Sequence, residues 1–104
     1  MAKSIMIGNK MNTFPKEIKE TLYYENIIVV LYRENKEIPN NVEFFDLNGN
    51  KLFTINDIVK AKIPRGYDHI KKKNETILIA ECEIGIIYEI DINNKIMINK
   101  EFVR

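Results

Sequence analysis

Residues 44–55 read FFDLNGNKLFTI, two short apolar runs separated by a polar turn. The dipeptide Asn48-Gly49 favours a two-residue type I′ turn, in which both central residues take positive φ. A turn centred there predicts a hairpin with three opposed pairs: Asp46 with Lys51, Phe44 with Phe53, and Val42 with Ile55. The apolar side chains then share one face, where cross-strand pairs stabilise a sheet. This stretch therefore predicts antiparallel β structure, and a structural role for the hairpin.

Residues 85–102, GIIYEIDINNKIMINKEF, predict a second hairpin. A two-residue turn at 93–94 would pair Asp91 with Ile96, which mixes charged and apolar side chains on one face. A three-residue turn at 93–95 separates them, and its pairs are Ile92 with Ile96, Ile90 with Ile98, and Ile86 with Phe102. Because a slip of one residue moves every side chain to the other face, we favour the three-residue turn.

Residues 26–33, NIIVVLYR, are continuously apolar and rich in β-branched side chains, which is typical of a strand covered on both faces. Residues 14–24 fit either a helical stripe or one face of a strand. We favour the strand, with one short helical turn near residues 15–22 as the alternative. Together these patterns predict an all-β protein, an antiparallel meander of about seven strands in a two-layer or barrel-like sheet.

Length and composition indicate one globular domain spanning residues 1–104, with 45% hydrophobic and 30% charged residues. The net charge is +1, from 16 basic and 15 acidic residues. This balance argues against nucleic acid as a partner, because nucleic-acid binding calls for a marked basic excess. It gives no reason to expect a membrane partner either. No stretch is long and apolar enough to span a bilayer, and the single Cys82 fits a reducing compartment, so we expect a cytoplasmic location.

Residues 56–75 form the longest stretch without a clear strand pattern, and Pro64 and Gly66 interrupt it. Long loops are often functional, so a binding site is expected there. The candidate partner-binding residues are Arg65, Tyr67, Asp68, His69, Lys71, Lys72 and Lys73. Basic side chains around a ring also resemble a groove for single-stranded nucleic acid, although a solvated charge run is the commoner origin of such a pattern in a lysine-rich chain.

The sequence contains no pattern that supports a catalytic or a metal-binding site. His69 and Cys82 are the only residues of their types, whereas a zinc site uses three or four ligands. Glu81 and Glu83 flank Cys82 and oppose formation of a thiolate, so a buried, inert thiol is expected there. Ser4 is the only serine and is far from His69 in sequence, so the sequence gives no support for a serine-hydrolase triad. We expect a protein that is not an enzyme and that holds no metal and no cofactor.

Three stretches carry a resemblance to a family: IIVVLY, NNVEFFDLNGNKLFTI and GIIYEIDINNKI, followed by a terminal KEFVR. They resemble small uncharacterised bacterial single-domain β proteins. The resemblance implies no catalytic residues. Some proteins of this kind are encoded beside bacterial toxins and act as immunity proteins, so the resemblance implies a protein partner.

The function expected from the sequence is therefore a non-enzymatic protein-binding domain, and the leading hypothesis is an immunity protein. It would block the active site of a cognate toxin with a rigid sheet face or with the segment 56–75. The alternative is a small ligand- or nucleic-acid-binding module that uses the basic residues of 65–73. A steep loss of oligonucleotide affinity with rising salt would favour this alternative.

Overall fold

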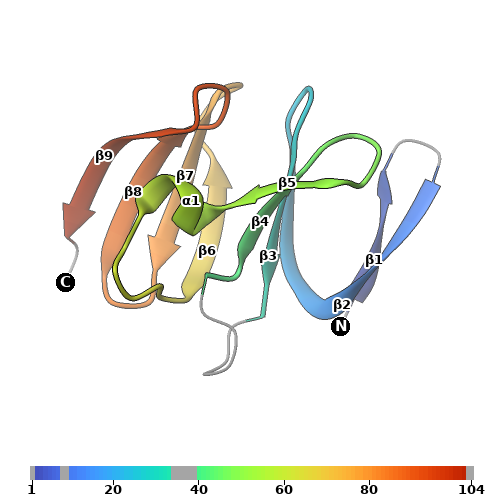
Figure 1. The fold of residues 1–104 in the computed structure, drawn as a ribbon, viewed down its shortest axis with the longest axis horizontal. Coiled ribbons are helices and arrows are strands. Elements are labelled where there is room, and N and C mark those ends of the chain that lie inside the picture. The colour runs from blue at the N-terminus through green and yellow to red at the C-terminus, as the bar shows by residue number, and fades with distance from the viewer. Residues whose placement is uncertain (1, 8–9, 34–39, 103–104) are drawn as a thin grey trace.

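Two open antiparallel sheets make up the fold (Figure 1). The structure, a computed structural model, describes residues 2–7, 10–33 and 40–102. The five-stranded sheet contains, in spatial order, β1 (Ala2–Ile7), β2 (Lys10–Tyr23), β3 (Ile28–Tyr32), β4 (Val42–Phe45) and β5 (Lys51–Thr54). The four-stranded sheet contains β6 (Tyr67–Lys72), β7 (Ile77–Cys82), β8 (Ile86–Asp91) and β9 (Ile96–Phe102). The helix α1 (Ile55–Val59) joins the two sheets along the chain.

The prediction of a mainly β, antiparallel fold is confirmed, but its details need correction. The described residues hold nine strands rather than about seven, and neither sheet closes into a barrel. Residues 15–22 lie within β2, so the alternative of a helical turn there is wrong. Phe14, Ile18 and Leu22 carry the pattern there, and they are spaced by four residues. Because four is an even number, this spacing fits one face of a strand as well as one face of a helix. Among the described residues, no helix has the length and hydropathy needed to cross a membrane.

The helix lies instead at Ile55–Val59, directly after β5. The carboxylate of Asp57 accepts the backbone N–H of Thr54 at 2.8 Å, which fixes the start of the helix. Lys60 ends it in the left-handed conformation with φ 56°, and its N–H donates to the carbonyl of Asn56. Ile55 and Ile58 are buried, so the helix closes one side of the core.

Two hydrophobic clusters lie on opposite faces of the five-stranded sheet. The larger cluster lies between the sheets and includes Val29 and Leu31 of β3. The smaller lies on the other face and includes Ile28 and Val30 from the same strand. All five residues of β3 are buried, which confirms the prediction that this strand is covered on both faces.

The hairpin of β4 and β5 has the predicted pairing at its centre and a different turn. Phe44 opposes Phe53, and their rings stack with centroids 4.5 Å apart. The N–H of Gly49 donates to the carbonyl of Asp46, and only Gly49 of the predicted Asn48-Gly49 pair has positive φ, at 86°. The turn is therefore a three-residue loop ending in glycine. A register shift next to it places Phe45 opposite Lys51, so the predicted pair of Asp46 with Lys51 is wrong.

The hairpin of β8 and β9 contains both registers that the sequence allows. Ile86 opposes Phe102, as the favoured register predicts. The register then shifts by one residue between Glu89 and Ile90. Beside the turn, Asp91 opposes Ile96, which is the pair expected for the two-residue turn. A β-bulge of this kind inserts one residue into a strand. The favoured register is thus correct for the far half of the hairpin and wrong next to the turn.

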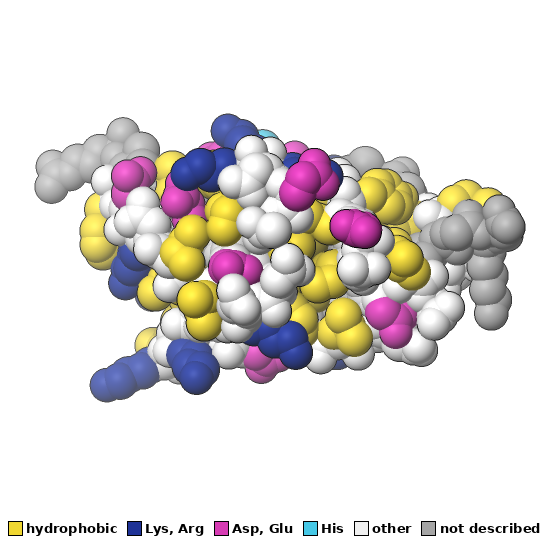
Figure 2. All heavy atoms as spheres, turned by 90° about the horizontal axis from the view of Figure 1, so that it is seen from above, with side chains coloured by type: hydrophobic (Ala, Val, Ile, Leu, Met, Phe, Trp, Pro, Cys, Tyr) yellow, Lys and Arg dark blue, Asp and Glu magenta, His cyan; other side chains and the backbone are white. Residues whose placement is uncertain are grey.

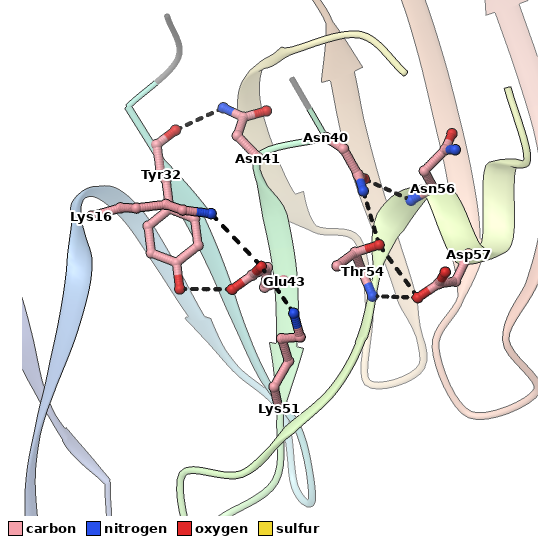
Figure 3. Close-up of polar contacts among 9 residues, drawn as sticks. All are labelled: Lys16, Tyr32, Asn40, Asn41, Glu43, Lys51, Thr54, Asn56 and Asp57. Atoms are coloured by element: carbon pink, nitrogen blue, oxygen red, sulfur yellow. Dashed lines mark hydrogen bonds and ion pairs between the residues drawn. The ribbon is translucent and has the colours of Figure 1, made fainter. Parts of the chain in front are cut away.

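Asn41 joins the two sheets at a fully buried position, and Figure 3 shows its contact with Tyr32. Its Nδ2 donates to the carbonyl of Tyr32 at 2.7 Å and to the carbonyl of Tyr67 at 3.1 Å, and its Oδ1 accepts the N–H of Tyr67 at 2.7 Å. The neighbouring Asn40 is left-handed with φ 59° and ties the start of β4 to α1, because its Oδ1 accepts the N–H of Asn56. These two amides fix how β3, β6 and α1 meet.

Candidate functional site

The segment predicted as one long binding loop, 56–75, is largely regular structure. It contains most of α1 and the whole of β6, so the prediction of a loop is wrong. In β6 only Tyr67 and Ile70 are buried. They lie three residues apart, an odd spacing that would place them on opposite faces of a regular strand. A register shift between Tyr67 and His69 inserts one residue and brings both onto the same face. The sequence conceals the strand because a bulge breaks its period of two.

Tyr67, one of the predicted partner-binding residues, belongs to the core. Its side chain is 4% exposed, and its ring lies 6.1 Å from that of Tyr88. Burial raises the pKa of the Tyr67 phenol far above its ordinary value, and the nearby Cys82 adds to the shift. The ring of Tyr67 therefore has no surface to offer a partner.

His69 is exposed and close to a carboxylate from the other sheet. Its Nδ1 lies 3.4 Å from Oε2 of Glu20, while Oε1 of the same carboxylate accepts the N–H of Ile70 at 2.9 Å. Glu20 thus bridges β2 and the edge of β6. The described residues contain no group of three or more His, Cys, Asp or Glu side chains placed to hold a metal ion. Asp68, next in the chain, contributes its carbonyl to a hydrogen bond from the Lys19 ammonium.

The three consecutive lysines of the predicted site are all paired with acidic groups. Lys71 lies 3.0 Å from Glu81 and Lys73 lies 2.7 Å from Glu89. Lys72 lies 3.3 Å from Glu75, and its ammonium also sits over the ring of Tyr24. These pairs lie at the surface and contribute little stability, but they cancel much of the local positive charge. Arg65 is exposed on the connection before β6.

Cys82, the last residue of β7, is buried at 5% exposure. The prediction that this thiol is buried is therefore confirmed. Its neighbour Tyr88 has a raised pKa because of burial and the nearby Cys82. The thiol therefore belongs to the larger core cluster.

A polar network crosses the curled sheet at Glu43 (Figure 3). Its side chain is 13% exposed and accepts a hydrogen bond from the Tyr32 hydroxyl at 2.9 Å. Lys51 lies 3.6 Å and Lys16 lies 4.0 Å from the same carboxylate. Burial, followed by the charge of Glu43, raises the pKa of Tyr32 well above its ordinary range. These four side chains come from four strands and satisfy one another, so the network holds the sheet together.

A different region has the features of a binding surface, the edge strand β9. All seven of its residues are exposed. We call five of them the β9 surface: Ile96, Met97, Ile98, Lys100 and Phe102. The exposed fractions of its four apolar members are 50% for Ile96, 38% for Met97, 48% for Ile98 and 74% for Phe102. Apolar groups of this size, exposed together on one strand, are typical of association sites.

The pairing with β8 explains why β9 carries these side chains. Opposed residues point to the same face of a sheet, and Phe102 and Lys100 oppose the buried Ile86 and Tyr88. Met97 likewise opposes the buried Ile90. The apolar inner face of the sheet thus continues onto β9, but there it remains exposed. Seen from above, hydrophobic side chains reach the surface among charged ones at the end of the molecule formed by this sheet (Figure 2).

The lysines near β9 lie against rings instead of carboxylates. The ammonium of Lys95 sits 5.1 Å from the ring centroid of Phe53, and that of Lys100 sits 5.3 Å from that of Phe102. Among the ion pairs of the described residues, none involves Lys95 or Lys100. Cation–π contacts leave the charge available to an incoming acidic group.

The sequence contains one signal of this surface that the predicted hairpin does not take into account. Residues 96–98, Ile-Met-Ile, are three consecutive apolar residues on a strand that follows an exposed turn. Strict alternation would place one of them on the solvent face. Only the sheet order, which leaves β9 at the edge, shows that all three are exposed.

Residues 2–102 match the model of one protein family, described as a domain of unknown function, DUF7957. The match covers nearly the whole chain and both sheets. The chain belongs to this family. No curated protein and no solved structure shows a significant match. Membership of DUF7957 thus agrees with the resemblance to small single-domain proteins of unknown function, and it assigns no activity.

Proposed function

We propose that this DUF7957 domain is a non-enzymatic protein-binding module, and that it binds its partner through the β9 surface. The observation that carries the proposal is the exposure of every residue of β9, although its inner face continues the apolar core. An exposed edge strand offers unpaired backbone groups together with apolar side chains. Binding of a partner there would remove both from water.

A protein partner is a better fit to the charges than a nucleic acid. The basic run at 71–73 faces carboxylates at 3.0, 3.3 and 2.7 Å, so it presents no strong positive field to phosphates. The exposed apolar area lies elsewhere, on β9. Apolar side chains with a few lysines around them match the composition of protein interfaces more closely.

The partner that we propose is a bacterial toxin, with the DUF7957 domain as its cytoplasmic immunity protein. This part of the proposal is supported by the resemblance of the chain to small β proteins encoded beside toxins. The domain would act by covering the active site of the toxin with the rigid end of its four-stranded sheet. Such inhibition needs shape and tight packing and no chemistry from the inhibitor.

A comparison of two variants tests the protein-binding function. Phe102→Asp places a charge on the β9 surface, whereas Leu52→Asp places one on β5, where the side chain is also exposed, at 46%. In pulldowns from the native host followed by mass spectrometry, we expect a protein that wild type and Leu52→Asp retain and Phe102→Asp loses. Titration calorimetry with that purified protein should show at least a roughly tenfold weaker affinity for Phe102→Asp. Equal binding by both variants, or no retained protein, would overturn the proposal.

The toxin assignment has its own test in the same system. Expression of the captured protein alone should stop bacterial growth, and co-expression of the wild-type domain should restore it. The Leu52→Asp variant should protect equally well, while Phe102→Asp should not. A captured protein that leaves growth unaffected would refute the immunity role and leave the binding function in place.

A further inference from the structure

We propose further that the partner binds by strand addition: an extended segment of it pairs with β9 as a fifth strand of the four-stranded sheet and places an acidic side chain opposite Lys100. This inference rests on the proposed function, since it names the mode of binding at the β9 surface. It also specifies the partner's chemistry, an alternation of apolar and acidic residues.

The two edges of the four-stranded sheet are treated differently by the rest of the chain. At the β6 edge, side chains of β2 satisfy backbone groups: Glu20 accepts the N–H of Ile70 at 2.9 Å, and Lys19 donates to the carbonyl of Asp68 at 2.6 Å. At the β9 edge, no side chain of the described residues makes a comparable hydrogen bond to the backbone of the strand. β9 is also the last strand in the sheet order. Its outward backbone groups are thus open to a new strand.

The inner face of β9 defines which strand would fit. Lys100 and Phe102 share that face, because they oppose Tyr88 and Ile86. Ile98 precedes Lys100 by two residues, at the bulge that separates the two registers. The resulting order is apolar, basic, apolar. A complementary strand would present an apolar, an acidic and an apolar residue at alternate positions, since directly opposed side chains interact across a ladder.

The distribution of paired and unpaired cations supports an acidic partner. The lysines at 51, 71, 72 and 73 each lie within ion-pair distance of a carboxylate. Six exposed cations form no ion pair with any described carboxylate: Lys19, Lys60, Lys62, Arg65, Lys95 and Lys100. Lys95 directly precedes β9, Lys100 lies within it between Ile98 and Phe102, and Lys60 caps α1, the helix that contacts β9. Unpaired cations therefore border the open edge.

A second copy of the chain is a poorer occupant of this edge. Two β9 strands paired antiparallel about Lys100 would oppose the two ammonium groups, and pairing about Glu101 would oppose two carboxylates. Like charges placed directly opposite each other destabilise a sheet. Pairing about Asn99 would set Lys100 against Ile98. An acidic segment from another protein avoids all three conflicts.

Designed peptides test the inference without knowledge of the partner. The probe is the capped peptide Thr-Val-Thr-Glu-Thr-Val-Thr, and its control carries Lys in place of Glu. Fluorescence anisotropy with the full domain should show about tenfold tighter binding of the acidic peptide at low salt. The Lys100→Glu variant should reverse the preference. N-methylation of the peptide amides that face β9 should abolish binding, because it removes hydrogen-bond donors and leaves the side chains unchanged.

Hydrogen exchange then locates the bound strand. Amides of β9 should exchange more slowly with the acidic peptide, while those of β6 should not change. Equal affinity for the two peptides, no effect of N-methylation, protection on another strand, or a stable dimer of the free domain would each overturn strand addition. If these results appear while Phe102→Asp still prevents capture of the native partner, the β9 surface binds by side-chain packing and the proposed function stands. If Phe102→Asp leaves that capture intact, the proposed function itself fails.

Discussion

The ring of Phe14 on β2 meets the ring of Phe45 on β4 edge to face, with centroids 5.1 Å apart and planes at 82°, although β3 lies between the two strands. Contact across an intervening strand requires the sheet to curl. The bulge between Ile18 and Glu20 provides the bend in β2. The Asn12 side chain reaches the hairpin turn at Gly49, so the curl continues to the far edge of the sheet. The smaller core depends on this geometry.

Replacement of Phe14 by alanine should therefore destabilise the domain strongly. The side chain is 6% exposed and packs against Phe45 and Tyr32. Loss of a buried phenylalanine costs about 3–5 kcal/mol. Urea denaturation followed by circular dichroism should show this decrease in the free energy of unfolding. Met11→Ala, on the same strand at 58% exposure, is the matched control and should change it by less than about 0.5 kcal/mol. Equal effects would mean that β2 does not fold over β4.

The amide of Asn41 should be as important to stability as a large core side chain. Asn41→Leu keeps the volume but leaves the N–H of Tyr67 and the carbonyls of Tyr32 and Tyr67 without their partner. Each unsatisfied buried group costs about 1–3 kcal/mol, so we expect a loss of roughly 3 kcal/mol or more in urea denaturation. Asn99→Leu, at an exposed position on β9, provides the comparison and should unfold near the wild-type midpoint. A stable Asn41→Leu variant would show that the two sheets meet without this amide.

The sequence predicts those parts of the fold in which side-chain period and strand period agree. The burial of both faces of β3 follows from its continuous apolar pattern, and the pairing of Phe44 with Phe53 follows from a turn placed between two apolar runs. The predicted pattern fails at bulges. In β6, and in the hairpin of β8 and β9, one inserted residue moves the register, and the strand then resembles a loop or the wrong pairing.

The candidate site is harder to predict from the sequence, because the exposure of an edge strand depends on the order of strands in the sheet. Tyr67 looks like a surface ring among basic residues, yet Asn41, distant in sequence, draws its backbone into the core. The lysines at 71–73 look like a positive patch, but Glu81 and Glu89 on β7 and β8 lie beside them. Conversely, Ile98 looks like a core residue and is 48% exposed. These outcomes are set by partners on other strands, which local sequence does not encode.

Alkaline pH should destabilise the domain through its buried phenols. Burial, and then the charge of Glu75, raises the pKa of Tyr24 from 10.0 to about 12. The folded pKa exceeds the unfolded value, so the stability contributed by the neutral phenol is complete below pH 10 and declines as the pH rises toward 12. Urea midpoints across this window should decrease more steeply for wild type than for Tyr24→Phe.

Tyr24→Phe also removes the hydrogen bond from the hydroxyl to the carbonyl of Ile77, at 2.8 Å. That loss costs about 1 kcal/mol at neutral pH. It does not affect the comparison, because the test compares only how steeply the urea midpoint changes with pH. Tyr23→Phe is the matched control, since Tyr23 is 52% exposed and adjacent in the chain. Identical slopes for wild type and Tyr24→Phe would show that the Tyr24 phenol ionises equally easily in the folded and unfolded chains.

Lys100 should keep the free domain monomeric. It lies on the inner face of an exposed edge strand, between apolar residues, and a lysine placed there opposes pairing of two edges. Lys100→Val removes the charge and leaves an uninterrupted apolar strip, so we expect a concentration-dependent increase in sedimentation coefficient. Lys62→Val removes an exposed cation from the connection between α1 and β6 and should leave the coefficient unchanged. If Lys100→Val remains monomeric at the highest concentration tested, the edge of β9 is protected by something other than this charge, with its bulge the next feature to remove.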